Sequence, residues 1–241
     1  MRKIFVSQVD GNKITLTGDN HNHLAYSMRS RIGDEIIACC DKIDYQCVIE
    51  RISKNETVLS VVSSTPVTTE PKVDITLFPA ILKGDKMEFV VQKTTELGVV
   101  ELRPFVSKNC ECRVTAVRID RLKKIAEEAS KQCGRGIIPK VFEVVDFAQV
   151  CEQISGFDLV VFPYENATKP SLKDFLKNKK GKKIAIIIGS EGGFTNEEVD
   201  ALISSGALPV TLGKRILRAE TASVAVCAVV AYEMDEWSRE I

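Results

Sequence analysis

Residues 1–70 contain short segments in which hydrophobic and polar residues alternate. A period of two turns one side of a strand toward a core and the other toward solvent, so each segment predicts a β-strand. Asp10-Gly11-Asn12 and Gly33-Asp34 provide turns between them. The predicted strands are 4–6, 13–16, 35–38, 45–49 and 58–62. Several short strands at this spacing favour a small β-barrel.

The pattern changes after residues 63–71, a stretch rich in Ser, Thr and Pro that we interpret as a linker. Strand-like segments then alternate with segments whose apolar residues recur at helical spacing. The expected strands are 75–78, 100–103 and 159–162, and the expected helices are 85–97 and 121–132. Alternating strands and helices predict an α/β fold with a parallel sheet. We therefore divide the chain into domains 1–70 and 71–241.

The run Ile-Ala-Ile-Ile-Ile at 184–188 predicts a strand that is buried on both faces. It leads into Gly189-Ser190-Glu191-Gly192-Gly193-Phe194, where three glycines allow the backbone to approach a ligand closely. Thr195 and Glu198 have the spacing of a capping box, so a helix is expected to begin at Thr195. The sequence therefore predicts a strand, a glycine turn and a helix in succession.

A second turn, 213–222, follows a predicted strand at 210–212 and leads into a helix over 223–232 that carries almost no charge. Such a helix is expected to be buried against the sheet or against a partner. Loops at the carboxyl ends of neighbouring parallel strands hold ligands in open α/β sheets, so the two turns together predict a cofactor site. Their spacing matches neither the dinucleotide motif G-x-G-x-x-G nor a P-loop. Taken alone, the first turn is also compatible with a tight connection that binds nothing.

Charge is balanced over the whole chain and segregated along it. The 33 Lys and Arg residues equal the 33 Asp and Glu residues, which argues against an indiscriminate binder of polyanions. Residues 102–140, however, hold ten Lys or Arg against four Asp or Glu, whereas 220–241 is acidic. The basic segment is a candidate surface for RNA backbone, and a solvated charged face is the alternative.

The eight cysteines include no C-x-x-C pair, and the N-terminus lacks the apolar region of a signal peptide. No apolar run reaches the ~18 residues of a membrane span. We therefore expect a cytoplasmic protein with reduced thiols and no membrane partner. No metal site is expected, since His21 and His23 have no apparent third ligand.

The two glycine-containing loops resemble a known family. Ile-Gly-Ser-Glu-Gly-Gly-Phe at 188–194 and Leu-Gly-Lys-Arg-Ile-Leu-Arg-Ala-Glu-Thr-Ala at 212–222 are similar to the signature of the SPOUT methyltransferases, and specifically of the RsmE family. Members methylate N3 of a uridine in 16S ribosomal RNA. Segments 23–34, 86–98 and 131–135 are also similar to the family, so the resemblance extends over nearly the whole chain. Two departures are Asn109, where many members have Arg, and Ser190, where Pro is usual.

The resemblance implies a C-terminal SPOUT domain with a trefoil knot and an N-terminal PUA-like domain that recognises RNA. It further implies a homodimer that acts on 16S ribosomal RNA of the small ribosomal subunit. S-adenosyl-L-methionine is expected between three loops, 163–165, 189–193 and 212–221, and its contacts are expected to be mostly with the backbone. The expected cofactor-binding residues are Pro163, Gly189, Glu191, Gly192, Leu212, Gly213, Ile216, Leu217 and Thr221. For Glu191, contact with RNA or hydrogen bonds within its own turn are alternatives.

Arg218 and Glu220, where the second loop meets the last helix, are the expected catalytic residues. The imide N3 of uridine carries a proton at neutral pH. Glu220 would either accept this proton or orient the uracil base. Arg218 would stabilise the negative charge that develops on the uracil oxygens. The alternatives are a macrodipole contact by Glu220 and a structural ion pair between the two residues.

Arg2, Arg29, Lys93 and Arg135 are the expected RNA-binding residues. A guanidinium fork matches phosphate oxygens, which is the reason for assigning Arg2 and Arg29. Lys93 and Arg135 lie in segments that resemble the family. Solvated arginines and, for Lys93, an ion pair with Glu96 on the same helix are the alternatives.

Two other functions are compatible with this scaffold. One is a ribosome-binding or assembly factor without catalysis, and the other is a SPOUT enzyme that acts on transfer RNA. The intact glycine loops favour an enzyme over the first, and the segment 23–29 favours ribosomal RNA over the second. Binding of S-adenosylmethionine separates the enzyme from the assembly factor.

Overall fold

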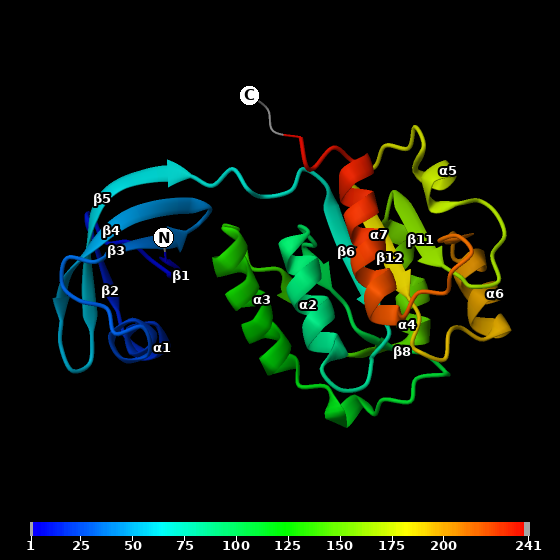
Figure 1. Cartoon of the computed structure of the whole chain (residues 1–241), viewed down its shortest axis with the longest axis horizontal. Coiled ribbons are helices and arrows are strands. Elements are labelled where there is room, and N and C mark those ends of the chain that lie inside the picture. Colours follow the sequence, from blue (N-terminus) through cyan, green and yellow to red (C-terminus); the bar gives the residue numbers. More distant parts are fainter. Residues whose placement is uncertain (1, 239–241) are drawn as a thin grey trace. The chain divides into compact units, whose positions relative to one another are not determined.

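The computed structural model describes residues 2–238, with the side chains of residues 3–238. The chain forms two compact units (Figure 1). The N-terminal unit contains the chain up to Glu70 together with Ser130–Ile138. The C-terminal unit contains Pro71–Ala129 and the chain from Pro139 onwards. A short segment from the second part of the chain therefore folds with the first part.

The C-terminal unit is built on a six-stranded sheet in which all neighbouring strands are parallel. The strand order is β13-β11-β12-β6-β7-β9. The bounds are β6 (Asp74–Pro79), β7 (Glu101–Leu102), β9 (Lys140–Val141), β11 (Leu159–Pro163), β12 (Lys183–Ile188) and β13 (Leu208–Val210). The predicted parallel sheet is confirmed, and its strands all end at one edge. A separate parallel pair joins β8 (Phe105–Val106) to β10 (Val145–Asp146).

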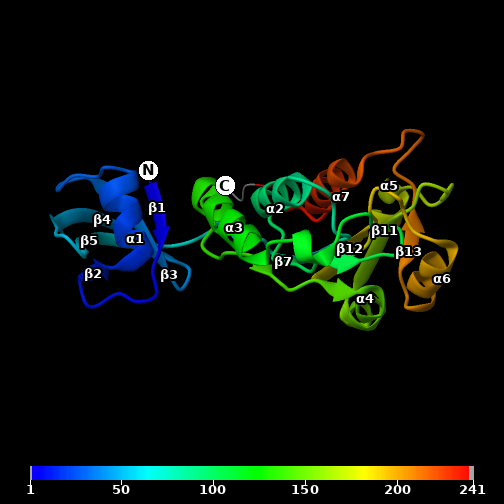
Figure 2. The ribbon, with the colours of Figure 1, turned by 90° about the horizontal axis from the view of Figure 1, so that it is seen from below.

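Helices cover both faces of this sheet (Figure 2). On one face, α2 (Lys86–Glu96) and α7 (Ala219–Glu233) pack against each other, while α4 (Phe147–Gln153) and α6 (Asn196–Ser204) lie on the other. The remaining helices are α3 (Ile119–Cys133), α5 (Leu172–Leu176) and the short η2 (Val114–Ala116) and η3 (Ile154–Gly156). Among residues 2–238, no helix combines the length and the apolar character that a membrane span requires.

β12 is buried on both faces, as its apolar run predicts. Residues 184–188 are at most 4% exposed. Ala185 and Ile187 pack with Phe78 and Phe162 in the cluster that α4 and α6 cover. Burial of one such isoleucine contributes about 2 kcal/mol, so packing from both sides fixes the strand and the turn that follows it.

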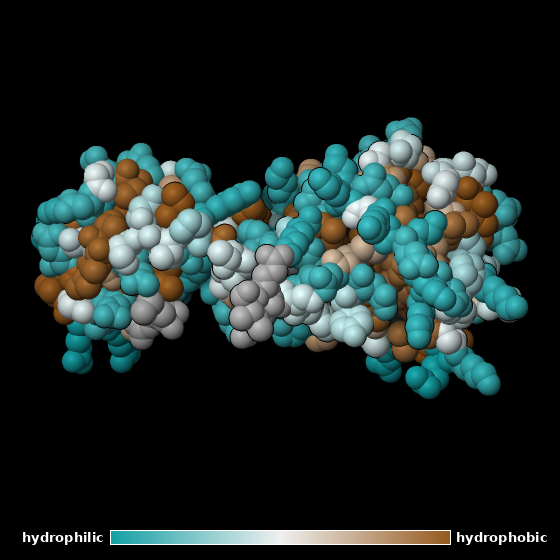
Figure 3. Space-filling view, turned by 90° about the horizontal axis from the view of Figure 1, so that it is seen from above, coloured by the Kyte–Doolittle hydropathy of each residue, from teal (hydrophilic) through white to brown (hydrophobic). Residues whose placement is uncertain are grey.

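Hydrophobic residues also reach the surface of each unit. On the face shown in Figure 3 they form separate patches among hydrophilic residues. The most exposed of them are Ile216 and Tyr232 in the C-terminal unit and Ile32 and Val62 in the N-terminal unit. Single exposed apolar residues are normal on protein surfaces and need no special explanation.

The N-terminal unit is a five-stranded sheet in the order β1-β3-β4-β5-β2. The bounds are β1 (Arg2–Phe5), β2 (Lys13–Leu16), β3 (Glu35–Cys40), β4 (Ile43–Ile52) and β5 (Thr57–Pro66). β1 and β3 are parallel, and the other neighbours are antiparallel. All five predicted strands are present, and α1 (Gly18–Asn22) and the π-helical η1 (His23–Ser27) connect β2 to β3.

The predicted linker begins too early. Residues 63–66 belong to β5, where Ser63 pairs with Gln46 and Pro66 pairs with Ile43 of β4. Their side chains are exposed on both sides of the strand, so no alternation of polar and apolar residues marks them. Backbone hydrogen bonds to β4 keep them in the sheet, and the connection between the units starts after Pro66.

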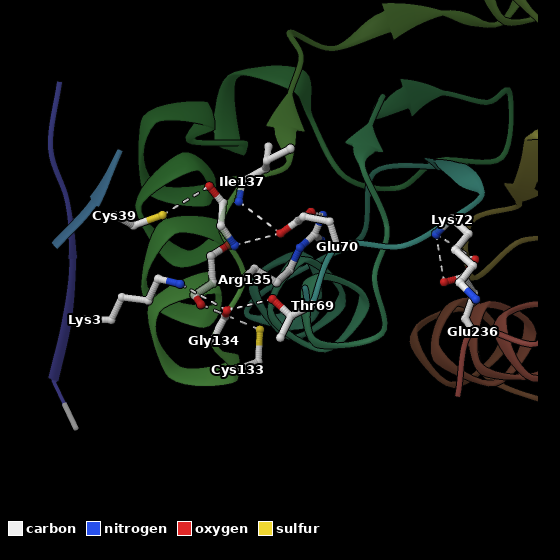
Figure 4. A network of polar contacts seen from close by, with 12 residues as sticks. Lys3, Cys39, Thr69, Glu70, Lys72, Cys133, Gly134, Arg135, Ile137 and Glu236 are labelled. Atoms are coloured by element: carbon white, nitrogen blue, oxygen red, sulfur yellow. Dashed lines mark hydrogen bonds and ion pairs between the residues drawn. The ribbon is translucent and has the colours of Figure 1, made fainter. Parts of the chain in front are cut away.

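A network of polar contacts attaches Ser130–Ile138 to the rest of the N-terminal unit (Figure 4). The Glu70 carboxylate accepts hydrogen bonds from Arg135 Nη2 at 3.0 Å and from the backbone N–H groups of Gly136 and Ile137 at 2.7 and 3.0 Å. Lys3 Nζ donates to the Gly134 carbonyl at 3.1 Å. The side chain of Arg135 is only 4% exposed, and the Glu70 carboxylate neutralises its positive charge inside the unit.

Candidate functional site

The turn after β12 has the architecture that its sequence predicts. β12 ends at Ile188, and α6 begins directly after its N-cap, Thr195. The Thr195 hydroxyl accepts a hydrogen bond from Glu198 N, and the Glu198 carboxylate accepts one from Thr195 N at 2.9 Å. The predicted capping box is confirmed. It fixes where the helix starts and therefore the length of the turn, 189–194.

Glycine is required within this turn because neighbouring atoms leave no room for a side chain. A Cβ on Gly192 would lie 2.8 Å from both Cβ and O of Asn109. Gly193 has φ +66°, and a Cβ there would lie 2.6 Å from the Glu165 carboxylate. The turn is therefore packed between two other loops, one following β8 and one following β11.

Three loops surround one cavity of about 600 Å³. They follow β11, β12 and β13, whose carboxyl ends lie at the same edge of the sheet. The cavity is lined by Lys86, Pro163, Tyr164, Glu165, Ile188, Gly189, Ser190, Glu191, Gly192, Gly193, Phe194, Thr211, Leu212, Gly213, Lys214, Arg215, Ile216, Leu217, Arg218, Ala219 and Ala222. Its volume falls within the range of about 300–1,000 Å³ that small-molecule sites occupy.

The structure brings together eight of the nine residues expected at a cofactor site. Pro163, Gly189, Glu191, Gly192, Leu212, Gly213, Ile216 and Leu217 all line the cavity. Thr221 does not line it; it lies in the first turn of α7, and its side chain is exposed. The strand before the third loop is β13 (Leu208–Val210), two residues earlier than predicted, so 211–212 belong to the cavity wall.

An ion pair forms part of the wall of the cavity. Lys86 Nζ lies 2.7 Å from Glu191 Oε1, and their side chains are 34% and 26% exposed. Partial burial raises the pKa of the Glu191 carboxyl, but hydrogen bonds from Lys86 and from backbone N–H groups outweigh it and hold that pKa below its usual value. Glu191 is therefore an anion at neutral pH, and it already has a partner within the protein.

The loop 107–109 holds the glycine turn from the other side. Asn109 Nδ2 donates to the carbonyl oxygens of Gly192 at 3.0 Å and Gly193 at 3.5 Å. Ser107 Oγ donates to Ser190 Oγ at 3.3 Å. The two residues that depart from the family pattern, Asn109 and Ser190, thus both take part in contacts that fix the turn.

Arg218 and Glu220 lie at the start of α7 and differ in their surroundings. Arg218 is the N-cap residue, its side chain is exposed, and it lines the cavity. Glu220 is partly buried and does not line the cavity, and its Oε2 atom is buried without a hydrogen-bond partner in the described structure. Within residues 2–238 no ion pair joins these two side chains.

The residues expected to contact RNA have unlike environments. Arg29 is exposed, and the side chain of Arg2 lies outside the described residues. Lys93 Nζ forms an ion pair with Glu96 at 2.8 Å, so the alternative to an RNA contact is present in the structure. Arg135 is buried and paired with Glu70, so the structure argues against its assignment to RNA.

Several residues of the cavity wall were not assigned from the sequence. Lys86 and Phe194 are the clearest cases. Lys86 starts the helix after β6, and β6 is the neighbour of β12, so its place at the same sheet edge follows once the strand order is known. The ring of Phe194 lies 3.1 Å from where a Cβ of Gly189 would be, a contact that only the folded turn reveals.

Models of known protein families match both parts of the chain. A family model described as an RNA methyltransferase domain matches residues 69–231, and one described as an RNA methyltransferase PUA domain matches residues 16–62. Ribosomal RNA small subunit methyltransferase E of Bacillus subtilis (strain 168) is 30% identical over 92% of this chain and 90% of its own length.

Two solved structures with bound cofactor are similar over almost the whole chain. Ribosomal RNA small subunit methyltransferase E from Neisseria gonorrhoeae, bound to S-adenosyl methionine, is 26% identical with a TM-score of 0.86, and the match covers 96% of this chain and 97% of that one. A methyltransferase from Legionella pneumophila, in complex with the cofactor SAM, is 28% identical with a TM-score of 0.87, covering 95% and 96%. The RNA methyltransferase domain, the PUA domain and these relatives show that the chain belongs to the ribosomal RNA small subunit methyltransferase E family.

Proposed function

We propose that this chain transfers a methyl group from S-adenosylmethionine to N3 of a uridine in 16S ribosomal RNA, in the cytoplasm. The observation that carries the proposal is the cavity between three loops, in a chain whose relatives are methyltransferases of small-subunit ribosomal RNA. Relatives solved with S-adenosylmethionine support the choice of cofactor.

The cavity wall fits an adenosyl cofactor. Gly192 and Gly193 have no room for a Cβ on the side of their neighbouring loops, so the backbone itself forms this wall. Ile188, Leu217 and Ala222 give the cavity apolar surface against which a purine can pack. Residues proposed to hold the cofactor are Pro163, Gly189, Glu191, Gly192, Leu212, Gly213, Ile216 and Leu217, chiefly through backbone groups. S-adenosylmethionine supplies a methyl group on a positively charged sulfur.

The reaction is an in-line displacement, so much of the catalysis by the protein is orientation of the reacting groups. Arg218 is placed to stabilise negative charge on the uracil oxygens, because its exposed guanidinium lines the cavity and has no ion-pair partner in the described structure. We propose that Glu220 accepts the proton of N3. Its Oε2 atom lacks a hydrogen-bond partner among the described residues, and because Glu220 does not line the cavity, the proton must reach it through a change of its rotamer or through a water molecule.

The N-terminal unit is proposed to recognise the RNA as a PUA-like domain over residues 1–70. Among the described residues its five strands form an open sheet with β1 and β2 at the edges, so the closed small barrel expected from the strand spacing is not formed. Arg2, Arg29 and Lys93 are proposed to contact phosphate. Lys93 would then have to exchange its ion pair with Glu96 for one with RNA. The C-terminal unit, 71–241, is proposed to have the knotted SPOUT topology, for which the convergence of three loops on one cavity is the support.

We also propose a homodimer formed through α7. The only charged residues of this helix are Glu220 and Glu233, and its side away from α2 and the sheet leaves Val229 38% and Tyr232 65% exposed. An apolar face on an otherwise buried helix favours association with a second copy. Sedimentation equilibrium is expected to give twice the mass of the chain. A monomeric mass for the wild type at micromolar concentration would contradict the proposal.

The function as a whole is tested by transfer of labelled methyl groups from S-adenosylmethionine to small ribosomal subunits that lack the modification. Nucleoside analysis is expected to give N3-methyluridine at one site. Binding of S-adenosylmethionine without labelling of any RNA nucleoside would reject ribosomal RNA as the substrate. Failure to bind the cofactor would instead favour a non-catalytic assembly factor.

Replacement of Asn109 by Asp tests the contact that holds the glycine turn. The two side chains have the same size, but the carboxylate cannot donate and would face the carbonyl oxygens of Gly192 and Gly193. We expect the calorimetric Kd for S-adenosylmethionine to rise about ten-fold, since a lost hydrogen bond of this kind costs about 1–2 kcal/mol. The control Asn178→Asp makes the same charge change at an exposed position of the same unit. Equal affinity in both variants would remove Asn109 from this role.

Replacement of Arg218 by Ala tests charge stabilisation at the substrate. We expect kcat to fall by about 100-fold or more, the usual effect of removing one preorganised donor. Cofactor affinity is expected to stay within a few fold, and Arg218→Lys to recover part of the rate because it keeps the charge. Full turnover by Arg218→Ala would exclude the assignment.

Replacement of Glu220 by Gln tests the proton acceptor through the pH dependence of kcat. A carboxylate that accepts the proton must be ionised, so the wild-type rate should fall as the carboxylate is protonated at low pH. In Glu220→Gln we expect a slower reaction without that fall. A pH–rate profile with the same shape as the wild type would show that another group takes the proton.

A further inference from the structure

An exposed aromatic residue of the N-terminal unit is held firmly in place. Tyr26 belongs to η1, and its side chain is 59% exposed. Its hydroxyl donates to the Lys54 carbonyl oxygen at 3.2 Å, and its ring centroid lies 5.6 Å from that of His21 with the planes at 80°. Contacts at both ends of the ring limit its rotamers while more than half of its surface stays open.

The residue beneath Tyr26 is a histidine with no free ring nitrogen. His21 is 2% exposed, its Nδ1 lies 2.8 Å from Thr57 Oγ1, and its Nε2 lies 3.2 Å from the same Lys54 carbonyl oxygen. Thr57 is itself completely buried. Both nitrogens of His21 are therefore used inside the fold. Its effect is to fix the turn at Lys54 and, with it, the position of Tyr26.

Three cations without ion-pair partners among the described residues belong to the segments that hold or follow this ring. The side chain of Lys54 is exposed, and so are those of Arg29 and Arg31, which follow η1 directly. Over residues 2–238 none of the three forms an ion pair, whereas the neighbouring Arg51 is paired with Glu56. Arg29 has φ 51°, in the left-handed region that a glycine would adopt more readily.

A fixed aromatic ring beside unpaired cations is the combination with which proteins bind single-stranded nucleic acid. Bases stack on the ring irrespective of their sequence, and the cations neutralise the adjoining phosphates. Arg29, Arg31 and Lys54 form no ion pair among the described residues, which favours a polyanionic partner. All of these residues lie within the part of the chain that matches the RNA methyltransferase PUA domain.

We propose that Tyr26 is a stacking platform for one unpaired base of the RNA substrate, with Arg29 and Lys54 binding the phosphates on either side. The proposal rests on the proposed function and adds to it a binding site outside the methyl-transfer cavity. It requires the RNA to present an unpaired nucleotide to the N-terminal unit, because the bases of a duplex are not free to stack on a side chain.

The test measures binding of a fluorescent single-stranded uridine-rich RNA, and of the small ribosomal subunit, to three variants of the full chain. Tyr26→Phe keeps the ring, Tyr26→Leu keeps apolar volume without it, and Val62→Ala changes another exposed residue of the same unit. We expect Tyr26→Leu to weaken binding of both RNAs about ten-fold, which is the effect of losing one stacked base. The affinity of Tyr26→Phe is expected to stay within about two-fold of the wild type, because the ring is kept. Val62→Ala is expected to bind like the wild type.

Equal affinities of the Phe and Leu variants would overturn the proposal, and so would a loss confined to the ribosomal subunit, which would indicate a protein contact. Thermal unfolding and the calorimetric Kd for S-adenosylmethionine are measured for each variant and are expected to be unchanged. These readouts separate the proposal from the proposed function. If the wild type binds RNA through Tyr26 but methylates none, the stacking site stands and the assigned reaction fails.

Discussion

The close packing of the glycine turn 189–194 is the constraint on which the site depends. A Cβ at Gly192 would collide with the Asn109 backbone and Cβ, so the loop after β8 can approach only because this position carries no side chain. Gly193 has φ +66°, a conformation that favours glycine, and lies against the Glu165 carboxylate of the loop after β11. The approach of the loop after β8 also lets Asn109 bind two carbonyl oxygens of the turn. Crowding and hydrogen bonding therefore act together, and a rigid backbone wall is the result.

The rest of the C-terminal unit keeps this turn where it is. β12 is buried between two helical layers, and the capping box at Thr195 fixes the start of α6. On the far side of the cavity, Arg218 is the N-cap of α7, a helix that packs against α2 and the sheet. The backbone positions at both sides of the cavity are thus set by buried elements, which is how a protein preorganises a site for positioning chemistry.

Much of this could be predicted from the sequence, because local signals determine it. The apolar run 184–188, the capping box and the pair of glycine-containing turns specified the strand, the turn, the helix and two of the three loops around the cavity. Long-range contacts decided the rest. Lys86 reaches the cavity through the order of the strands, Arg135 is buried by Glu70 from 65 residues away, and residues 63–66 are held in β5 by β4 although their sequence shows no alternation. No local pattern encodes such pairings.

We propose that the cavity between the three loops holds the methyl donor. A crystal structure of the chain with S-adenosylmethionine tests it most directly. We expect the cofactor between residues 163–165, 189–193 and 212–219, in contact with the backbone of the glycine turn and with the Asn109 hydrogen bonds intact. A cofactor bound elsewhere, or a glycine turn that moves away from Asn109 to admit it, would contradict this assignment.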